Sequence, residues 1–169
     1  MNRYRRLALL MIAAAAAWPA VLSAQAPAQS VKPDFSGRWR MEKDKSNFGS
    51  FQVPDLVVQV VEHRDPTLNV HTVETTGKQT STADVSYFTD GTPSNNIIKG
   101  RKAESKAFWD GAALNVRTSE KDSKGEDVVI EDRWELSEDG QTLTRTSHII
   151  TEKGSVDLKL ISQKEKSGS

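Results

Sequence analysis

An acid, a tryptophan and an arginine fall on one face of a predicted hairpin in the second half of the chain. Asp139-Gly140 is typical of a tight turn between two antiparallel strands. Because side chains alternate along a strand, Asp132, Trp134 and Arg145 then share one inner face. A guanidinium inside an apolar cup is suited to hold a carboxylate or another anionic head group.

The same residues also fit a structural role. Buried charges are usually paired with each other, so Asp132 and Arg145 would form an ion pair that closes one end of the fold. Arg145 would then stack on Trp39 or Trp134. An anionic ligand would have to compete with Asp132 for the guanidinium, which weakens the binding interpretation.

A file of small residues suggests where space is left inside the fold. Ala103, Ser105 and Ala107 point to one side of their strand, and small inward side chains leave room for a ligand. Aromatic residues at a spacing of two, in contrast, are more typical of an ordinary core. The candidate ligand-binding residues are Arg145, Asp132, Trp134, Tyr87 and Ser105.

No pattern in the chain predicts a catalytic residue, a metal site or a cofactor. The chain has no cysteine, which excludes disulfides and thiolate ligands. In the simplest register His63 faces Leu68 and His71 faces Val60, so these two histidines lie on opposite sides of the sheet and do not form a joint metal site. Nucleophile, zinc-protease and phosphate-loop motifs are absent from the sequence. An enzyme that works through Asp132 stays the least favoured alternative.

From Asp34 onward the chain consists of short β-patterned runs separated by turn signals, which predicts an all-β domain. The segment 89–100, with its glycine, proline and asparagines, is expected to be the longest polar loop. The nine candidate strands are Phe35–Glu42, Leu56–His63, Leu68–Glu74, Gln79–Phe88, Ala103–Trp109, Ala112–Ser119, Asp127–Leu136, Thr142–Thr151 and Val156–Ile161.

Sequential hairpins predict an antiparallel up-and-down meander of about eight to nine strands that closes into a barrel, because closure removes unpaired edges. If Asp110-Gly111 is a two-residue turn, Ala107 faces Leu114 and Ser105 faces Val116. On the other side of the same hairpin, Glu104 then faces Arg117 as a cross-strand ion pair.

The start of the domain carries a family resemblance. Gly37-Arg38-Trp39 resembles the Gly-x-Trp that opens the first strand of the calycin barrels, the lipocalins and the intracellular fatty-acid-binding proteins. The resemblance implies a lipocalin-like barrel whose floor is closed by Gly37, Trp39 and an arginine from a late strand, here Arg145. Segment 49–55 leaves no space for the two lid helices of a fatty-acid-binding protein. The runs 109–111 and 134–143 also resemble small exported bacterial β-proteins of no known activity.

The N-terminus has the parts of a cleaved secretory signal, namely three arginines, the apolar run 7–17 and small residues near position 24. We therefore expect a signal peptide over 1–24, a linker over 25–33, a barrel over 34–163 and a disordered tail over 164–169. Removal of the signal leaves 20 basic and 23 acidic residues, a net charge of −3. This mixed surface argues against nucleic acid or an anionic membrane as the partner.

These features favour a periplasmic or secreted monomer that binds a small apolar or anionic ligand and performs no chemistry. The alternative is a filled barrel that acts as a protein-interaction module in the cell envelope through segment 89–100, because long loops on rigid β scaffolds often carry function. An internal cavity near Arg145 distinguishes the two hypotheses.

Overall fold

The computed structural model describes residues 31–166, all of which belong to one β-sheet or its connections. The predicted signal peptide and most of the predicted linker lie outside the described residues. One turn of 3-10 helix, η1 (Lys43–Lys45), is inserted after the first strand. The ten strands are β1 (Gly37–Met41), β2 (Leu56–Arg64), β3 (Thr67–Thr76), β4 (Gln79–Phe88), β5 (Ser94–Ile98), β6 (Arg101–Asp110), β7 (Ala113–Lys121), β8 (Asp127–Leu136), β9 (Thr142–Thr151) and β10 (Gly154–Lys164).

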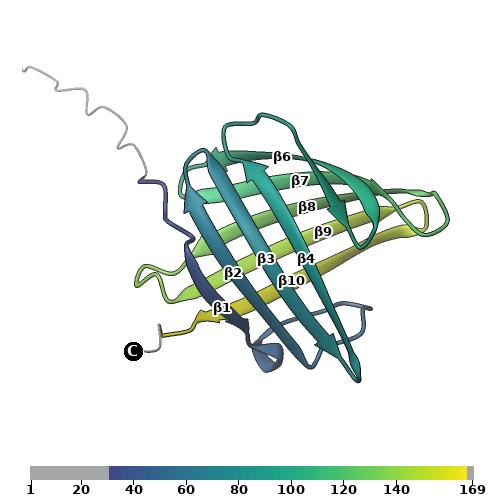
Figure 1. The fold of residues 1–169 in the computed structure, drawn as a ribbon, viewed down its shortest axis with the longest axis horizontal. Helices are drawn as coiled ribbons and strands as arrows, with labels where there is room; N and C mark the ends of the chain where they lie inside the picture. Colours follow the sequence, from purple (N-terminus) through teal and green to yellow (C-terminus); the bar gives the residue numbers. More distant parts are fainter. Residues whose placement is uncertain (1–30, 167–169) are drawn as a thin grey trace, which may run out of the picture.

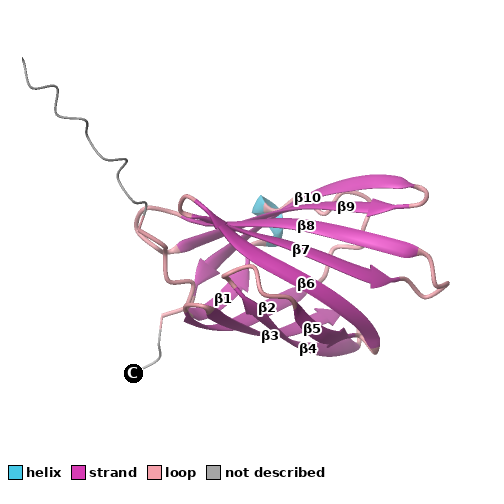
Figure 2. Ribbon diagram, turned by 90° about the horizontal axis from the view of Figure 1, so that it is seen from above, coloured by secondary structure: helices cyan, strands magenta, loops and turns pink. Residues whose placement is uncertain are grey.

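The strands follow one another around an antiparallel barrel. Each strand pairs with its neighbour in the chain, except that β4 and β5 share no ladder and β10 returns to pair with β1. Figure 1 shows β2, β3 and β4 crossing the strands β6 to β9 at a steep angle. Seen from above, strands β1 to β5 and strands β6 to β10 form two facing layers (Figure 2). The barrel is therefore nearly closed, with a gap between its two edge strands.

The strand count differs from the sequence-based expectation of eight to nine. The additional strand, β5, lies within segment 89–100, which we expected to be a polar loop. Ser94 is buried and pairs with Ser105, while its neighbours Asn95 and Ile97 are exposed. The period-two alternation is therefore present, but a serine and an asparagine occupy the inner positions, so hydrophobicity does not reveal it.

The hairpin between β8 and β9 has the predicted register. Trp134 pairs with Arg145 and Asp132 pairs with Ser147, so the predicted inner face is confirmed. Leu114, Val116 and Trp134 are all buried, as an enclosed core requires.

The hairpin between β6 and β7 is shifted by two residues from its predicted register. Ala107 pairs with Val116 rather than Leu114, and Asp110 pairs with Ala113, so the turn is Gly111-Ala112. Gly111 has a φ of 63°, which fits a turn with glycine at its first central position. A shift of two keeps every side chain on its predicted face.

The shift in that hairpin removes the predicted Glu104–Arg117 pair. Arg117 instead forms an ion pair with Glu131 on the neighbouring strand β8. Glu104 pairs with Ser119 across the ladder. The cross-strand ion pair therefore exists on the outer face, but between β7 and β8.

The C-terminal end of the barrel extends past its predicted boundary. Lys164 is the last residue of β10, and the Glu165 amide donates a hydrogen bond to the carbonyl of Arg38. The Glu165 carboxylate also accepts hydrogen bonds from Arg38 and Arg40, at 2.5 and 2.6 Å. These two residues, which we expected in a disordered tail, are thus fixed to β1 because its arginines supply the partners.

None of the helical structure within residues 31–166 is long and apolar enough to cross a membrane.

Candidate functional site

A cavity of about 480 Å³ lies inside the barrel. Its walls are mainly apolar and come from both layers and from the segment that joins β1 to β2. Of the predicted ligand-binding residues, Arg145, Trp134 and Tyr87 line it. Its other side chains include Met41, Phe48, Val57, Val70, Ala83, Val85, Ile98, Leu143, Leu158 and Leu160, with Gln59, Thr72, Glu74 and Lys99 as polar members.

Arg145 is the central polar residue of the cavity. Its guanidinium carbon lies 5.7 Å from the centre of the Trp134 ring, over its face. The Nε atom is buried and has no hydrogen-bond partner, and no carboxylate within the described residues lies within ion-pair distance of this side chain. A guanidinium usually satisfies its donors when it is buried. Arg145 therefore retains the capacity to bind an anionic group.

Asp132 does not form the ion pair with Arg145 that the structural interpretation required. Its carboxylate accepts a hydrogen bond from the hydroxyl of Ser147, which lies opposite it on β9. Asp132 and Arg145 are diagonal neighbours on the same face, two residues apart along the ladder. Asp132 is also not part of the cavity lining. Two groups that we expected to neutralise each other thus have separate surroundings.

Ser105 does not line the cavity either. It is fully buried, its hydroxyl lies 2.8 Å from that of Thr118, and its carbonyl accepts a hydrogen bond from Ser94. Its neighbours Ala103 and Ala107 are likewise buried without facing the cavity. The small-residue wall therefore allows close packing in this part of the barrel instead of leaving space.

Tyr87 is a buried member of the cavity wall. Burial raises the pKa of its phenol, and the charge of Asp132 raises it further, whereas Arg145 acts in the opposite direction. The phenol therefore stays neutral under ordinary conditions and keeps a proton to donate. Tyr87 and Arg145 both line the cavity, whereas Asp132 does not.

The floor of the barrel is built from aromatic side chains. Phe35 stacks on Trp109 with ring centres 5.9 Å apart and meets Trp134 edge to face at the same distance. The Trp39 indole N–H donates a hydrogen bond of 2.9 Å to the Phe35 carbonyl. Phe35 and Trp39 are fully buried, so this end of the barrel is closed.

The charged residue over Trp39 is Lys164, whose ammonium lies 5.2 Å from the ring centre. The resemblance to calycins implied Arg145 at this place, but Arg145 stacks on Trp134 instead. Gly37 gives Lys164 its space, because a Cβ at position 37 would lie 2.5 Å from Cε of the lysine. Sequence reasoning missed Lys164 because it assigned this residue to the tail.

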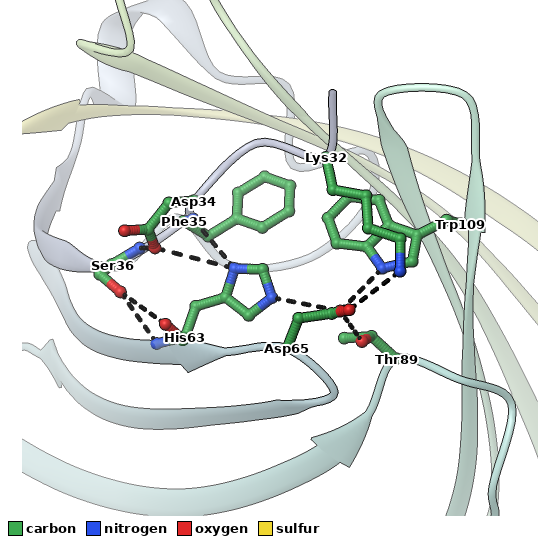
Figure 3. A network of polar contacts seen from close by, with 8 residues as sticks. All are labelled: Lys32, Asp34, Phe35, Ser36, His63, Asp65, Thr89 and Trp109. Carbon is green, nitrogen blue, oxygen red and sulfur yellow. Dashed lines mark hydrogen bonds and ion pairs between the residues drawn. The ribbon is translucent and has the colours of Figure 1, made fainter. Parts of the chain in front are cut away.

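His63 lies in a polar network at the same end, which ties the chain before β1 to the barrel floor (Figure 3). The Phe35 amide donates to Nδ1 of His63 at 3.3 Å, so Nε2 carries the proton of the neutral ring. Burial lowers the pKa of His63, while the carboxylates of Asp34 and Asp65 act in the opposite direction. The neutral ring is thus a structural element of the floor.

Asp65 holds the other side of this network. Its carboxylate accepts hydrogen bonds from the Thr89 hydroxyl, from the Lys32 ammonium at 2.9 Å and from the Trp109 indole N–H at 3.1 Å. These bonds, that from Thr89 foremost, lower the pKa of Asp65 to about 2. Lys32 also lies 5.5 Å from the centre of the Trp109 ring. Nε2 of His63 is the one buried atom of this network without a hydrogen-bond partner among the described residues, and it lies 3.9 Å from the Asp65 carboxylate.

The three histidines do not converge. The pairs His63–Leu68 and His71–Val60 have the predicted register. His71 and His148 each lie 2.6 Å from a carboxylate, Asp84 and Asp157 respectively. Within residues 31–166 no group of three or more histidine and acidic side chains is arranged to hold a metal ion.

A second hollow, of about 680 Å³, lies on the outside of the β-sheet over strands β6 to β10. Several of its charged side chains form ion pairs, as Arg117 does with Glu131 and His148 with Asp157. Its lining also includes Asp132 and Lys159. We call this hollow the outer groove. None of its lining residues has a buried polar side-chain atom without a hydrogen-bond partner within residues 31–166, in contrast to Arg145.

The mouth of the cavity is covered by the segment between β1 and β2, residues 42–55. Phe48, Phe51 and Pro54 of this segment line the cavity, and Phe51 is half exposed. The segment contains only the single helical turn η1, as the short spacing predicted. It therefore covers the cavity without a pair of lid helices.

The comparison with solved structures concerns the fold. The zebrafish ileal bile acid-binding protein complexed with cholic acid matches with a TM-score of 0.57 and 16% identity, over 78% of this chain and 98% of that chain. The chain shares the β-barrel fold of this protein. The described strands form a ten-stranded, nearly closed up-and-down barrel with a gap between β4 and β5, as in the fatty-acid-binding proteins. The expectation of a closed lipocalin-like barrel of about eight to nine strands is corrected accordingly.

Two further solved structures have a similar fold. A secretory abundant heat soluble protein from Ramazzottius varieornatus has a TM-score of 0.56 and 14% identity, over 81% of this chain and 99% of that chain. The Echinococcus granulosus fatty-acid-binding protein 1 has a TM-score of 0.52 and 16% identity, over 78% and 98%. The chain matches no protein-family model and no curated protein. At these identities the likeness concerns the fold alone.

Proposed function

We propose that this protein binds a small, largely apolar molecule with an anionic group inside the calycin barrel and does no chemistry on it. The observation that carries the proposal is the state of Arg145, which lines the cavity with a buried Nε that has no hydrogen-bond partner among the described residues. A charged donor without a partner is costly in a buried position, and an anionic ligand would relieve that cost.

The walls of the cavity support an apolar body for the ligand. Most of the lining side chains are aliphatic or aromatic, and the volume of about 480 Å³ lies within the usual range of small-molecule sites. Burial of apolar ligand surface would contribute roughly 25 cal/mol per Å². The apolar walls therefore supply most of the affinity, while Arg145 orients the ligand.

The neighbouring structures are consistent with this type of ligand. One is named for bile acids and was solved with cholic acid, and another is named for fatty acids. Both kinds of molecule combine an apolar body with a carboxylate. The low identity transfers no binding residue, so the proposal depends on the cavity of this chain.

We further propose that the protein acts outside the cytoplasm, as a periplasmic or secreted monomer. The support is the sequence of residues 1–24, with its arginines, its short apolar run and its small residues. Cleavage at this point would leave the barrel free of the export signal.

The two rival hypotheses have less support. Segment 89–100 contains β5 and is part of the barrel wall, so it is not the free recognition loop that an interaction module would need. The cavity also argues against a filled barrel. Asp132 is bonded to Ser147 and lies outside the cavity lining, so it is poorly placed to act on a molecule inside.

A titration with two probes of similar shape and different charge tests the proposal. We expect the anionic probe 1-anilinonaphthalene-8-sulfonate to bind. Arg145→Gln should lower the affinity for this probe about tenfold or more, because one hydrogen bond to a charged group is lost. The same substitution should change the affinity for the neutral probe N-phenyl-1-naphthylamine less than about twofold.

Arg133→Gln is the matched control, because Arg133 lies on the neighbouring strand but faces the outer groove. It should leave the affinity for both probes unchanged. Absence of binding to the native protein, or an equal effect of the two substitutions, would contradict the proposal.

A further inference from the structure

One side chain closes the gap in the barrel wall. Asn96, on β5, accepts a hydrogen bond from the Ser86 amide on β4 at 2.9 Å and donates one to the Ser86 carbonyl at 3.0 Å. Both backbone groups of a single residue are thus paired by one carboxamide. Asn96 takes the place that a residue of an adjacent strand would have in a continuous ladder.

This contact matters because β4 and β5 are the only neighbouring strands in the described barrel without a ladder. Elsewhere many backbone bonds hold each pair of strands, for example from Thr67↔Phe88 to Thr76↔Gln79 between β3 and β4. Ser86 itself is fixed from the other side, since its hydroxyl donates a 2.7 Å hydrogen bond to Asn69 on β3. Strand β4 is therefore held firmly to β3, and the joint to β5 is the weaker one.

The two ends of the gap are closed differently. At one end the connection 89–93 is fixed to the barrel, because the Gly91 amide donates a 2.8 Å hydrogen bond to the Ala107 carbonyl. At the other end Lys99, just after β5, forms an ion pair of 3.6 Å with Glu74 on β3. Both charged groups are partly exposed, and such pairs contribute little to stability. Asn96 lies between a fixed end and a weakly held end.

The cavity reaches the gap from inside. Its lining includes Ala83 and Val85 on β4, Ile98 on β5, and both members of the Lys99–Glu74 ion pair. A separation of β5 from β4 would therefore open the cavity to solvent along this side.

We propose that Asn96 is a clip that holds this gap closed and controls the rate at which ligand enters and leaves the cavity. The inference builds on the proposed function, because it needs a ligand that uses the cavity. Opening breaks two side-chain hydrogen bonds and one exposed ion pair, and it leaves the rest of the barrel intact. The mouth segment 42–55, with Phe48, Phe51 and Pro54 packed over the cavity, stays in place during this opening.

Binding kinetics test the clip. Asn96→Ala removes both hydrogen bonds, so the open state should become about tenfold more populated. Association and dissociation of 1-anilinonaphthalene-8-sulfonate in stopped-flow mixing should each accelerate by about that factor, while Kd changes less than about twofold. The control is Asn95→Ala, at the adjacent exposed position of β5, which should leave both rates unchanged.

A ligand-free measurement separates this inference from the proposed function. In a Trp109→Phe background the remaining tryptophans of the barrel, Trp39 and Trp134, are both buried, and Trp134 lines the cavity. Acrylamide should quench their emission more strongly after Asn96→Ala and not after Asn95→Ala. If the probe does not bind to any variant, the proposed function fails while quenching still decides whether the clip exists.

Unchanged quenching together with unchanged rates in a folded Asn96→Ala protein would overturn the clip. Where that variant does not fold, Asn96→Asp serves instead, because its carboxylate accepts from the Ser86 amide but cannot donate to the Ser86 carbonyl. Asn96→Asp should also increase quenching. If its quenching equals that of the native protein, the clip is refuted.

Discussion

The ammonium group of Lys164 lies 5.2 Å from the ring centre of Trp39 and closes the floor of the barrel. This contact joins the last residue of β10 to the first strand, so the two ends of the barrel sequence stabilise each other. The absence of a side chain at Gly37 makes the contact possible, since a Cβ there would collide with the lysine stem at 2.5 Å. The Gly-x-Trp of the first strand is thus explained by a partner near the C-terminus.

Gly37→Ala is expected to destabilise the protein more than Gly154→Ala, although the two glycines have similar φ angles. Gly37 has a φ of 146° and Gly154 a φ of 130°, but a Cβ at position 154 would have no atom within 4 Å. Because the flexible Lys164 side chain can turn away and lose only its contact with Trp39, the collision should add about 0.5–1 kcal/mol to the loss at position 37, measured by urea unfolding. In a Lys164→Ala background the difference between the two glycines should disappear. A difference that persists there would show that Lys164 is not its cause.

Stability is expected to fall as the pH is lowered through the titration of His63. Because burial lowers the pKa of His63 in the folded protein, the folded state binds the proton more weakly than the unfolded chain does. The contribution of the neutral ring is complete above the unfolded value of about 6.5 and is lost as the pH decreases from there to the folded value. Urea unfolding at a series of pH values, with NMR titration of the ring, measures this. A ring that titrates above 6.5 in the folded protein would contradict it.

Two alanines of the barrel interior are expected to respond oppositely to enlargement. Ala83 lines the cavity, whereas Ala107 is 1% exposed and packed in the core. Ala83→Phe should fill empty space and therefore change the free energy of unfolding by less than about 1 kcal/mol. The same substitution should lower the affinity for the anionic probe at least about tenfold. Ala107→Phe should cost about 1–3 kcal/mol or more through overpacking. Equal destabilisation by both changes would mean that the cavity is not open at Ala83.

The sequence predicted the class of the fold well because alternation and turn residues carry that information locally. The hairpin at Asp139-Gly140 has the predicted pairs, including Trp134 with Arg145. At Asp110-Gly111 the same dipeptide signal misplaced the turn by one residue, because only Gly111 adopts a positive φ there. Side chains kept their predicted faces because the resulting shift was even.

Features that depend on distant segments could not be predicted from local patterns. β5 was missed because Ser94 and Asn96 occupy its inner positions, and the role of Asn96 becomes visible only when Ser86 of β4 lies beside it. Asp132 does not pair with Arg145 because its carboxylate is hydrogen-bonded to the hydroxyl of Ser147. Strand β9 contains several polar residues, and the sequence does not show which of them bonds Asp132.

The side-chain signal of Arg145 offers the most direct test of the central claim, that the barrel cavity binds an anionic, largely apolar molecule. The Nε–H resonance of Arg145 can be followed in ¹⁵N-labelled protein during titration with cholate and with oleate. We expect this resonance to shift and saturate, together with the indole signal of Trp134, while the Nε–H signals of Arg117 and Arg133 in the outer groove stay in place. Saturating shifts confined to Arg117 and Arg133, or no shift at Arg145 with either molecule, would contradict the account.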